Sequence, residues 1–368
     1  MIKDRTLMPL RVLMIARPNL YSVPGGDTVQ INETAKALRA MQVEVDIIVS
    51  GKIDYSRYDL IHFFNIIDPE DILGHIFKSN LPYVVSTIYV DYREYDRKYR
   101  VGAVGKLSRL LSRDTIEYLK TLAKFVFKKE SVSTIRFFLK GHRKSIVYIA
   151  NHAAILLPNS ENEYRRLKED YGINQDYSVV PNAINTSIFN HTSATKETER
   201  DIVLCVARIE GQKNQLNVIR ALKDTDFKVV FVGAASPNQP DYIAQCHKEA
   251  TENMQFIPHL PQSELLQYYN RAKVHILASW FETTGLSNLE AGVLGCNLVV
   301  GKRGDVEEYF ENFVYYCDPE DINSIKDAVN NAWNKESSED LKQHILNNFT
   351  WERAAKITLT AYKNILNR

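Results

Sequence analysis

The sequence lacks the patterns that mark metal sites, disulfide scaffolds and membrane spans. Its 368 residues contain only four cysteines, and no two of them form a C-x-x-C pair. This argues against a zinc site or a disulfide framework and favours a reducing compartment. No apolar run is long enough to cross a bilayer, and the first residues are too polar for a secretory signal. We therefore expect a cytoplasmic protein that needs no metal.

The chain also has almost no net charge. It contains 46 Lys and Arg against 45 Asp and Glu, a formal charge of +1, so no global attraction to nucleic acid is expected. Hydrophobic residues at 45% and charged residues at 25% are ordinary for a globular protein. There is no low-complexity tract and no short-period repeat. The length is sufficient for two domains with their own cores.

Apolar, strand-like segments alternate with helix-like segments along the whole chain. The strand candidates are 11–17, 43–49, 59–64, 83–87, 155–160, 177–182, 201–207, 227–233, 254–260, 274–279, 297–301 and 314–318. A polar stretch at 190–201 interrupts the alternation, and we place a domain boundary there, between 1–190 and 191–349. The pattern predicts an α/β protein with two open parallel sheets and crossover helices.

Ligands of such sheets bind at the carboxyl ends of the strands, which directs attention to three turns. The first follows residues 11–17, where Gly25 and Gly26 precede a helix-like segment. Backbone N–H groups in such a turn can approach an anion at the helix start. The turn is not G-x-G-x-x-G, and it is equally typical of an ordinary glycine-bearing connection.

The second turn follows residues 201–207 and contains Arg208 and Lys213 on either side of Gly211. A guanidinium offers a forked set of donors and an ammonium offers a mobile point charge, so together they can neutralise a diphosphate. Two surface charges on a solvated loop are the common alternative for an isolated R-x4-K pattern.

The third turn follows residues 274–279 and reads FETTGLSNLEAG. A helix start at Gly285 and Leu286 can hold phosphate oxygens, Glu290 can accept from a ribose diol, and Glu282 can accept from sugar hydroxyls. A glycosidase acid and base pair is a poor fit, because nearby basic groups and a helix start favour two ionised carboxylates. A helix-start acid followed by a solvated glutamate is the plainer alternative.

Taken together, these stretches resemble the retaining GT-B glycosyltransferases of family 4 (glycosyl transferases group 1). The E-x7-E spacing with Gly285 follows an R-x4-K pair in the same half, and that family shows the same order. Three further stretches resemble elements of the family: LLPNSENEYRRL at 156–167, SVVPNAINTSIF at 178–189 and TWERAAKITLTAYKNIL at 350–366. The resemblance runs nearly end to end and is weakest from about 90 to 150.

The resemblance implies two Rossmann-like, doubly wound domains that face each other across a cleft. Residues 1–190 would bind the acceptor and 191–349 the nucleotide sugar, and the C-terminal helix at about 350–368 would pack back on the first domain. Arg208 and Lys213 would bind the donor diphosphate, Glu290 the ribose and Glu282 the transferred sugar. The other donor contacts that the resemblance implies are Gly285, Leu286, Thr284, His259, Leu260 and, across the cleft, Gly26.

The sequence departs from the family pattern at two places. Thr283 and Thr284 replace the usual Gly-Phe, so the sugar pocket is expected to differ in shape. The family often has a histidine after its fourth N-terminal strand, and this chain has none there. Tyr89 or Asp91 is the tentative substitute on the acceptor side. His62 resembles the family's D-x-x-H segment, although a buried structural histidine fits the pattern as well.

The implied activity is retaining transfer of a sugar from a UDP- or GDP-sugar to a glycan or lipid-linked acceptor. Lipopolysaccharide, O-antigen or capsule synthesis in bacteria is the expected setting. Catalysis would rest on stabilising the leaving diphosphate without a required cofactor. Front-face attack and a short-lived covalent intermediate are both open. The alternatives are a nucleotide-sugar epimerase of the same fold and a non-catalytic glycan- or membrane-binding relative.

Residues 100–144 are strongly basic. They contain twelve Lys and Arg and three acids, so their charge is 12 − 3 = +9 and the rest of the chain carries about −8. Leucines and phenylalanines are interleaved with the charges. Such a segment can lie on an anionic membrane surface, on the inner face of the plasma membrane, near a lipid-linked acceptor. Helices packed on the first sheet with a solvated basic face are the alternative, and no nucleic-acid recognition fold surrounds the patch.

Overall fold

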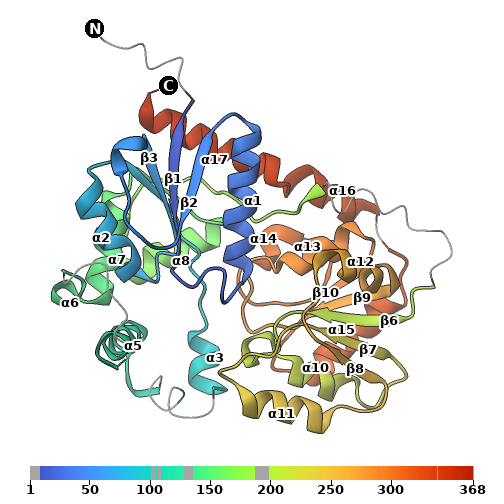
Figure 1. The fold of residues 1–368 in the computed structure, drawn as a ribbon. Coiled ribbons are helices and arrows are strands. Elements are labelled where there is room, and N and C mark those ends of the chain that lie inside the picture. The colour runs from blue at the N-terminus through green and yellow to red at the C-terminus, as the bar shows by residue number, and fades with distance from the viewer. Residues whose placement is uncertain are drawn as a thin grey trace. The chain divides into compact units, whose positions relative to one another are not determined.

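The computed structural model describes residues 9–100, 105, 109–127, 136–186, 199–337 and 339–367. The chain divides into two compact units, which are described separately (Figure 1). The first unit contains Met1–Tyr89, Val101–Asn182 and Trp351–Arg368. The second unit contains Val90–Arg100 and Ala183–Thr350. None of the helices in the described residues is long and apolar enough to cross a membrane.

The first unit is built on a five-stranded parallel sheet. Its strands are β1 (Arg11–Ile15), β2 (Glu44–Ile48), β3 (Leu60–Phe64), β4 (Tyr83–Ser86) and β5 (Ile155–Leu157). They lie in the order β2-β1-β3-β4-β5, and every neighbouring pair is parallel. The order reverses between β1 and β3, which defines the switch point of this sheet. All residues of β3 and β4 are buried, as expected for strands covered on both faces.

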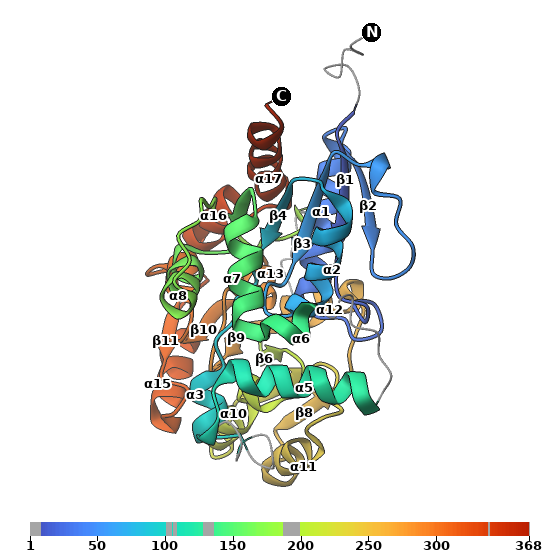
Figure 2. The same cartoon turned by 90° about the vertical axis from the view of Figure 1, so that its left-hand side faces the viewer.

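Helices of the first unit bury the faces of its sheet. They are α1 (Gly26–Ala40), α2 (Pro69–Ser79), α5 (Arg113–Phe127), α6 (Arg136–Lys140), α7 (His142–His152), α8 (Glu161–Tyr171) and α17 (Trp351–Leu366). The C-terminal helix α17 packs against α1, so the two ends of the chain's sequence meet in one unit (Figure 1). Helices α2, α5 and α6 all pack on α7 (Figure 2).

The second unit is built on a six-stranded parallel sheet. Its strands are β6 (Ile202–Val206), β7 (Lys228–Val232), β8 (Met254–Ile257), β9 (Ala272–Leu277), β10 (Asn297–Gly301) and β11 (Tyr315–Cys317). The order is β11-β10-β9-β6-β7-β8, again with parallel neighbours. The first strand β6 therefore lies beside the fourth strand β9, and the switch point falls between them.

Side chains of the second sheet alternate between two cores because neighbouring strand residues point to opposite faces. Ile202 and Leu204 of β6 lie in one core, and Val203 and Cys205 lie in the other. The helices of this unit are α3 (Arg93–Lys98), α10 (Gln215–Leu222), α11 (Pro240–Glu249), α12 (Gln262–Arg271), α13 (Leu286–Val293), α14 (Val306–Phe310), α15 (Ile322–Trp333) and α16 (Glu339–Asn348). The four cysteines of the chain are buried and unbridged.

The predicted two parallel sheets are confirmed, and eleven of the twelve predicted strands are present. The strand expected at 177–182 was wrong: only Tyr177 forms a bridge, to Leu156. The chain does run beside β5, because the Val180 N–H donates to the Pro158 carbonyl at 2.8 Å. Proline has no N–H, so Pro158 and Pro181 cannot extend the ladder.

The contacts place the boundary between the units after Asn182, whereas the sequence placed it at 190. Most of the polar stretch 190–201 that suggested the boundary lies outside the described residues. A second difference is that Val90–Arg100 belongs to the second unit although its sequence neighbours on both sides belong to the first. This segment has consequences for the site described next.

Candidate active site

The second unit brings two of the three predicted turns together at its switch point. Because β6 and β9 are neighbouring parallel strands, their carboxyl ends meet at one edge of the sheet. Arg208 and Lys213 follow β6, and Glu282 and Gly285 follow β9. The two turns are also joined by their backbones, since the Trp280 N–H donates to the Gln212 carbonyl at 3.0 Å. The topology therefore assembles a basic and an acidic loop in the place where such sheets bind ligands.

Lys213 and Glu282 form an ion pair. The Lys213 Nζ lies 2.6 Å from Oε1 of Glu282, and the two side chains are 21% and 9% exposed. Burial acts to lower the pKa of Lys213, but the Glu282 carboxylate outweighs it and raises that pKa well above its usual value. The ammonium is therefore charged throughout the physiological range, in a setting with little water.

The position of Glu282 is set by a neighbouring loop. The Asp305 N–H donates to the Glu282 carbonyl at 2.8 Å, and the Glu282 N–H donates to the Arg303 carbonyl at 3.3 Å. Gly304 stands between these two bonds with a φ of +90°. A Cβ at Gly304 would overlap the Glu282 carbonyl oxygen, so both the backbone angle and the space require glycine. The carboxylate is thus held on a rigid support.

Helix α13 begins directly after the acidic loop, with Gly285 as its N-cap at a φ of +69°. The first N–H groups of a helix have no partner within it and attract anions. Thr284 is completely buried, and in the described part of the chain its Oγ1 makes no hydrogen bond. The Ser287 hydroxyl donates to the Val206 carbonyl at 2.8 Å, which fixes the helix start against the end of β6.

Glu290 lies just over one turn into α13 and is held by two donors from α12. The Gln262 amide donates to its Oε1 at 2.8 Å, and the Tyr269 hydroxyl donates to its Oε2 at 2.7 Å. Burial raises the pKa of Glu290, while the two donors act in the opposite direction. A half-buried, oriented carboxylate of this kind can accept further hydrogen bonds from a diol.

The remaining predicted donor residues of this unit lie around the same sheet edge. Arg208 is half-buried, and its guanidinium is 3.9 Å from the Glu210 carboxylate. His259 and Leu260 follow β8: His259 is exposed, and Leu260 packs on the core formed with α12 and α13. No group of three His, Cys, Asp or Glu side chains within the described residues is arranged to hold a metal ion.

The glycine turn of the first unit uses two of its N–H groups within the protein. Gly25 is the N-cap of α1, and its N–H donates to the Thr28 hydroxyl at 3.0 Å. The Asp27 carboxylate accepts from the Thr28 N–H at 2.9 Å and pairs with Arg17 at 2.6 Å. The N–H groups of Gly25 and Thr28 are thereby used, and Asp27 adds negative charge. Gly26 is exposed at the helix start, and its contact with a donor stays a prediction.

His62 is a core residue of the first unit. Its side chain is 1% exposed, its Nδ1 is 2.6 Å from the Tyr362 hydroxyl, and its Nε2 is 2.8 Å from the Ser86 hydroxyl. Burial lowers the pKa of His62 to about 3, so the ring is neutral. Both ring nitrogens are occupied, and the structural interpretation of this histidine replaces the acceptor-side one.

Tyr89 and Asp91 are also engaged within the protein. Tyr89 is 1% exposed, and its hydroxyl donates to the Asp170 carboxylate at 2.6 Å. The Asp91 carboxylate pairs with Arg93 at 2.8 Å and accepts from the Arg93 N–H at 3.0 Å. The assignment of these two side chains to the acceptor side stays a prediction.

Sequence reasoning missed the residue that follows Asp91. Tyr92 precedes α3, and its ring meets that of Phe281 edge-on, with the centroids 6.1 Å apart. Phe281 is the residue immediately before Glu282. The available signal was the absence of the family histidine from TIYVDYREY, which marked the segment without showing which of its residues reaches the site.

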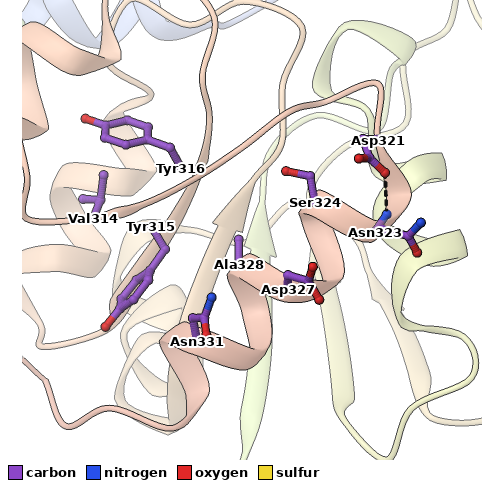
Figure 3. Close-up of a pocket in the computed structure, with 9 residues that line it drawn as sticks. All are labelled: Val314, Tyr315, Tyr316, Asp321, Asn323, Ser324, Asp327, Ala328 and Asn331. Carbon is purple, nitrogen blue, oxygen red and sulfur yellow. Dashed lines mark hydrogen bonds between the residues drawn. The ribbon is translucent and has the colours of Figure 1, made fainter.

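A hollow of about 510 Å³ lies elsewhere in the second unit (Figure 3). Its walls are formed by residues around β11 and α15, including Tyr315, Ser324 and Asp327. Strand β11 is the edge of the sheet, two strands away from β9. The hollow contains no basic residue and none of the predicted site residues, so we do not assign a ligand to it.

Comparison with known proteins agrees with this geometry. Residues 187–348 match the family model described as Glycosyl transferases group 1. An uncharacterized glycosyltransferase of Methanocaldococcus jannaschii is 24% identical over 337 residues, covering 85% of this chain and 77% of that protein. Residues 187–348, which match the family model, contain both site turns.

Two solved structures share the fold over nearly the whole chain. Sucrose-phosphate synthase from Thermosynechococcus elongatus superimposes with a TM-score of 0.74 at 15% identity, covering 97% of this chain and 99% of the other. The Anabaena protein Alr3699/HepE, solved in complex with UDP, gives a TM-score of 0.67 at 14% identity, covering 96% and 100%. Residues 187–348 thus form a group 1 glycosyl transferase domain, and the chain is a glycosyltransferase with the GT-B fold.

Proposed function

We propose that this glycosyltransferase is a family 4 enzyme that transfers a sugar from a nucleotide diphosphate sugar with retention of configuration. The observation that carries the proposal is the Lys213–Glu282 ion pair beside the start of α13. The pair places a permanent cation and a sugar-binding carboxylate at the carboxyl end of the two switch-point strands. An epimerase of the same fold binds no acceptor, and a binding module does not have to stabilise a leaving diphosphate.

The chemical step follows from the charges. When the sugar–phosphate bond breaks, negative charge develops on the leaving diphosphate, and Lys213, Arg208 and the helix start of α13 stabilise it. Glu282 accepts from hydroxyls of the sugar, and the buried hydroxyl of Thr284 offers a further partner. Glu290 holds the ribose through the carboxylate lone pairs that Gln262 and Tyr269 do not use. The acceptor oxygen forms the new bond to the anomeric carbon, and its proton passes to the leaving diphosphate, so no protein side chain has to change its protonation state.

The comparisons favour a UDP-sugar as the donor, because the similar Anabaena protein was solved with UDP and with UDP-glucose. GDP-sugars are the alternative. The acceptor is a glycan or a lipid-linked saccharide, and synthesis of a bacterial surface polysaccharide is the proposed setting.

The surface of the first unit supports a lipid-linked acceptor. On α5, Leu119, Leu122 and Phe125 are 44%, 36% and 47% exposed. These side chains follow one another at helical spacing within the basic segment 100–144, part of which lies outside the described residues. Leu139 at the end of α6 is 82% exposed. Apolar side chains of this size among Lys and Arg suit the interface of an anionic membrane.

A binding experiment followed by product analysis tests the proposed function. A thermal-shift screen of the full chain with UDP, GDP and a panel of their sugars should raise the melting temperature with one base, since binding to the folded state stabilises it. With that donor and a lipid-linked saccharide, the product should be an elongated glycan with the donor's anomeric configuration. An epimerised donor, or binding without turnover, would assign the chain to one of the two alternatives.

Liposome flotation tests the membrane contact. The wild-type chain should float with vesicles that contain anionic lipid and should be released by high salt. Phe125→Asp should abolish flotation, because it places a charge on the apolar face of α5. Ile322→Asp changes a residue of the second unit that is similarly exposed, at 36%, and should leave flotation unchanged. Equal flotation of both variants, or none by the wild type, contradicts the contact.

A further inference from the structure

One segment of the chain packs on both loops of the site. Residues Val90–Arg100 lie in the second unit, while the chain before and after them belongs to the first. Tyr92 contacts Phe281, beside Glu282, as described above. Tyr95 is buried, and its hydroxyl lies so close to Gly211 that a Cβ there would overlap it. Each of the two loops that carry Glu282 and Lys213 is therefore in contact with this segment.

Aromatic stacking holds the segment in place. The ring of Tyr99 stacks on Trp280, with the centroids 4.1 Å apart and the planes at 23°, and Tyr95 meets the same indole at 6.2 Å. Trp280 and Phe281 are only 5% and 6% exposed. Large aromatic side chains that cover one another in this way contribute strongly to an interface.

Ion pairs reinforce the same contact. Lys98 lies 3.2 Å from Glu320, and Arg303 lies 3.7 Å from Glu94. Arg303 is the residue whose carbonyl accepts from the Glu282 N–H. The segment is thus linked to the loop that supports Glu282 as well as to Glu282's own loop.

The Tyr92 hydroxyl is the polar atom that this arrangement brings to the site. It interacts electrostatically with both Lys213 and Glu282, and burial raises the pKa of Tyr92 to about 12, so the phenol keeps its proton. Within the described residues it makes no hydrogen bond. A half-buried phenol without a partner next to a sugar-binding carboxylate is placed to donate to, and accept from, a ligand.

We propose that Tyr92 is a specificity-determining residue for the transferred sugar, and that Tyr95, Tyr99 and Trp280 position it. This inference rests on the proposed function. The Tyr92 hydroxyl contacts a hydroxyl group of the hexose, whereas the diphosphate, ribose and base are bound by other residues. A loss of this hydroxyl should therefore weaken recognition of the sugar and leave recognition of the nucleotide unchanged.

Calorimetric titration separates the two parts of the ligand. The titrations use the full wild-type chain. The affinity for the best-bound UDP-hexose divided by the affinity for UDP gives the contribution of the sugar. Tyr92→Phe should lower the affinity for the UDP-hexose and kcat/KM by about tenfold, leave the UDP affinity within twofold, and change the order of preference among UDP-hexoses. If the chain binds GDP instead, the GDP series replaces the UDP series.

Tyr316→Phe is the matched control, because it removes a phenol hydroxyl of the second unit from the edge strand β11, where that hydroxyl donates to the Glu311 carbonyl. It should leave the sugar contribution unchanged. The melting temperature of Tyr92→Phe should stay within about 2 °C of wild type. Unchanged sugar affinity and preference in Tyr92→Phe, or a larger fall in melting temperature, would overturn the assignment. If the wild type binds no nucleotide sugar at all, the proposed function itself fails.

Discussion

The ammonium of Lys213 lies 2.6 Å from the carboxylate of Glu282, across 69 positions of sequence. In the described residues, Lys213 has no equally close carboxylate on its own loop after β6. Glu282 has no equally close cation on its own loop after β9. Lys213→Met should leave an unpaired carboxylate and Glu282→Gln an unpaired ammonium. Each change is expected to reduce the free energy of unfolding by roughly 1–3 kcal/mol, a range that allows for the partial exposure of Lys213.

The double variant distinguishes this pairing from two separate contributions. Lys213→Met with Glu282→Gln should cost less than the sum of the two single changes, as measured by chemical denaturation. All three variants should lose transfer by more than about a hundredfold, because Lys213→Met removes the cation that meets the developing diphosphate charge and Glu282→Gln removes the carboxylate that binds the sugar. Additive stabilities, or substantial turnover in Lys213→Met, would contradict these roles.

Gly304 supports Glu282 through its lack of a side chain. Gly304→Ala should displace the Glu282 carbonyl and reduce kcat by about tenfold or more, because a small misplacement of a positioning group is costly. Gly51→Ala is the matched control for backbone strain: its φ is +109°, and a Cβ there meets no atom within 4 Å. Steady-state kinetics of both variants measure the difference. Equal kcat for both would show that Glu282 tolerates the shift.

Glu290 is expected to contribute to binding of the nucleotide part alone. Glu290→Ala should weaken UDP and a UDP-sugar by the same factor, on the order of tenfold to a hundredfold, since the lost hydrogen bonds go to the ribose. Calorimetric titration with both ligands gives the two factors. A loss confined to the UDP-sugar would move Glu290 from the ribose to the sugar. This pattern is the opposite of the one expected for Tyr92.

His62 should affect stability and not catalysis. Replacing it with alanine removes the partners of the Ser86 and Tyr362 hydroxyls and opens a cavity, so a loss of roughly 2–4 kcal/mol is expected. Activity per folded molecule should stay within a few-fold of wild type. The measurement is thermal unfolding together with kinetics well below the melting temperature. A specific loss of kcat in a stable variant would restore the catalytic interpretation.

A buried histidine makes the first unit sensitive to pH. His142 lies 2.8 Å from Asp114, which also faces Arg143 and Tyr171, and Glu70 lies nearby. Burial acts to lower the pKa of His142, but Asp114 raises it above the usual 6.5. Protonated His142 therefore stabilises the fold below that value, and its contribution is lost as the pH rises through the folded-state pKa.

Asp114 makes the stability of the first unit depend on pH on the acidic side. Burial opposes its charge, but His142 and Tyr171 hold the pKa of Asp114 below its usual value, so its contribution is lost on acidification. Unfolding curves between pH 5 and 9 should show lower stability on the alkaline side, and His142→Gln should flatten that dependence. An unchanged slope in the variant would assign the effect to other groups.

The sequence was sufficient for the two parallel sheets because they depend on local patterns. Fully buried parallel strands such as Val229–Val232 are continuous apolar runs, and the turns after them carry their functional residues at fixed spacing. The strand at 177–182 failed because hydrophobicity does not show where proline interrupts a ladder. His62 was ambiguous for a similar reason: its partner Tyr362 lies 300 residues away in sequence.

The sequence could not predict that Val90–Arg100 belongs to the second unit. Its flanking residues have the pattern of the first unit, and the stacking of Tyr99 on Trp280 joins positions that are remote in the chain. The same limit applied to Tyr92. Identifying a residue that reaches a site from another part of the chain requires the tertiary fold, whereas a turn that follows its own strand does not.

The exchange of segments between the two units also has a consequence for biosynthesis. Helix α17, which packs on α1, leaves the ribosome after the other described elements of both units. The first unit therefore cannot be completed until α17 has emerged, whereas the second has received all its segments once Thr350 has emerged. We expect the C-terminal unit to mature first during translation, in reverse of the usual N-to-C order.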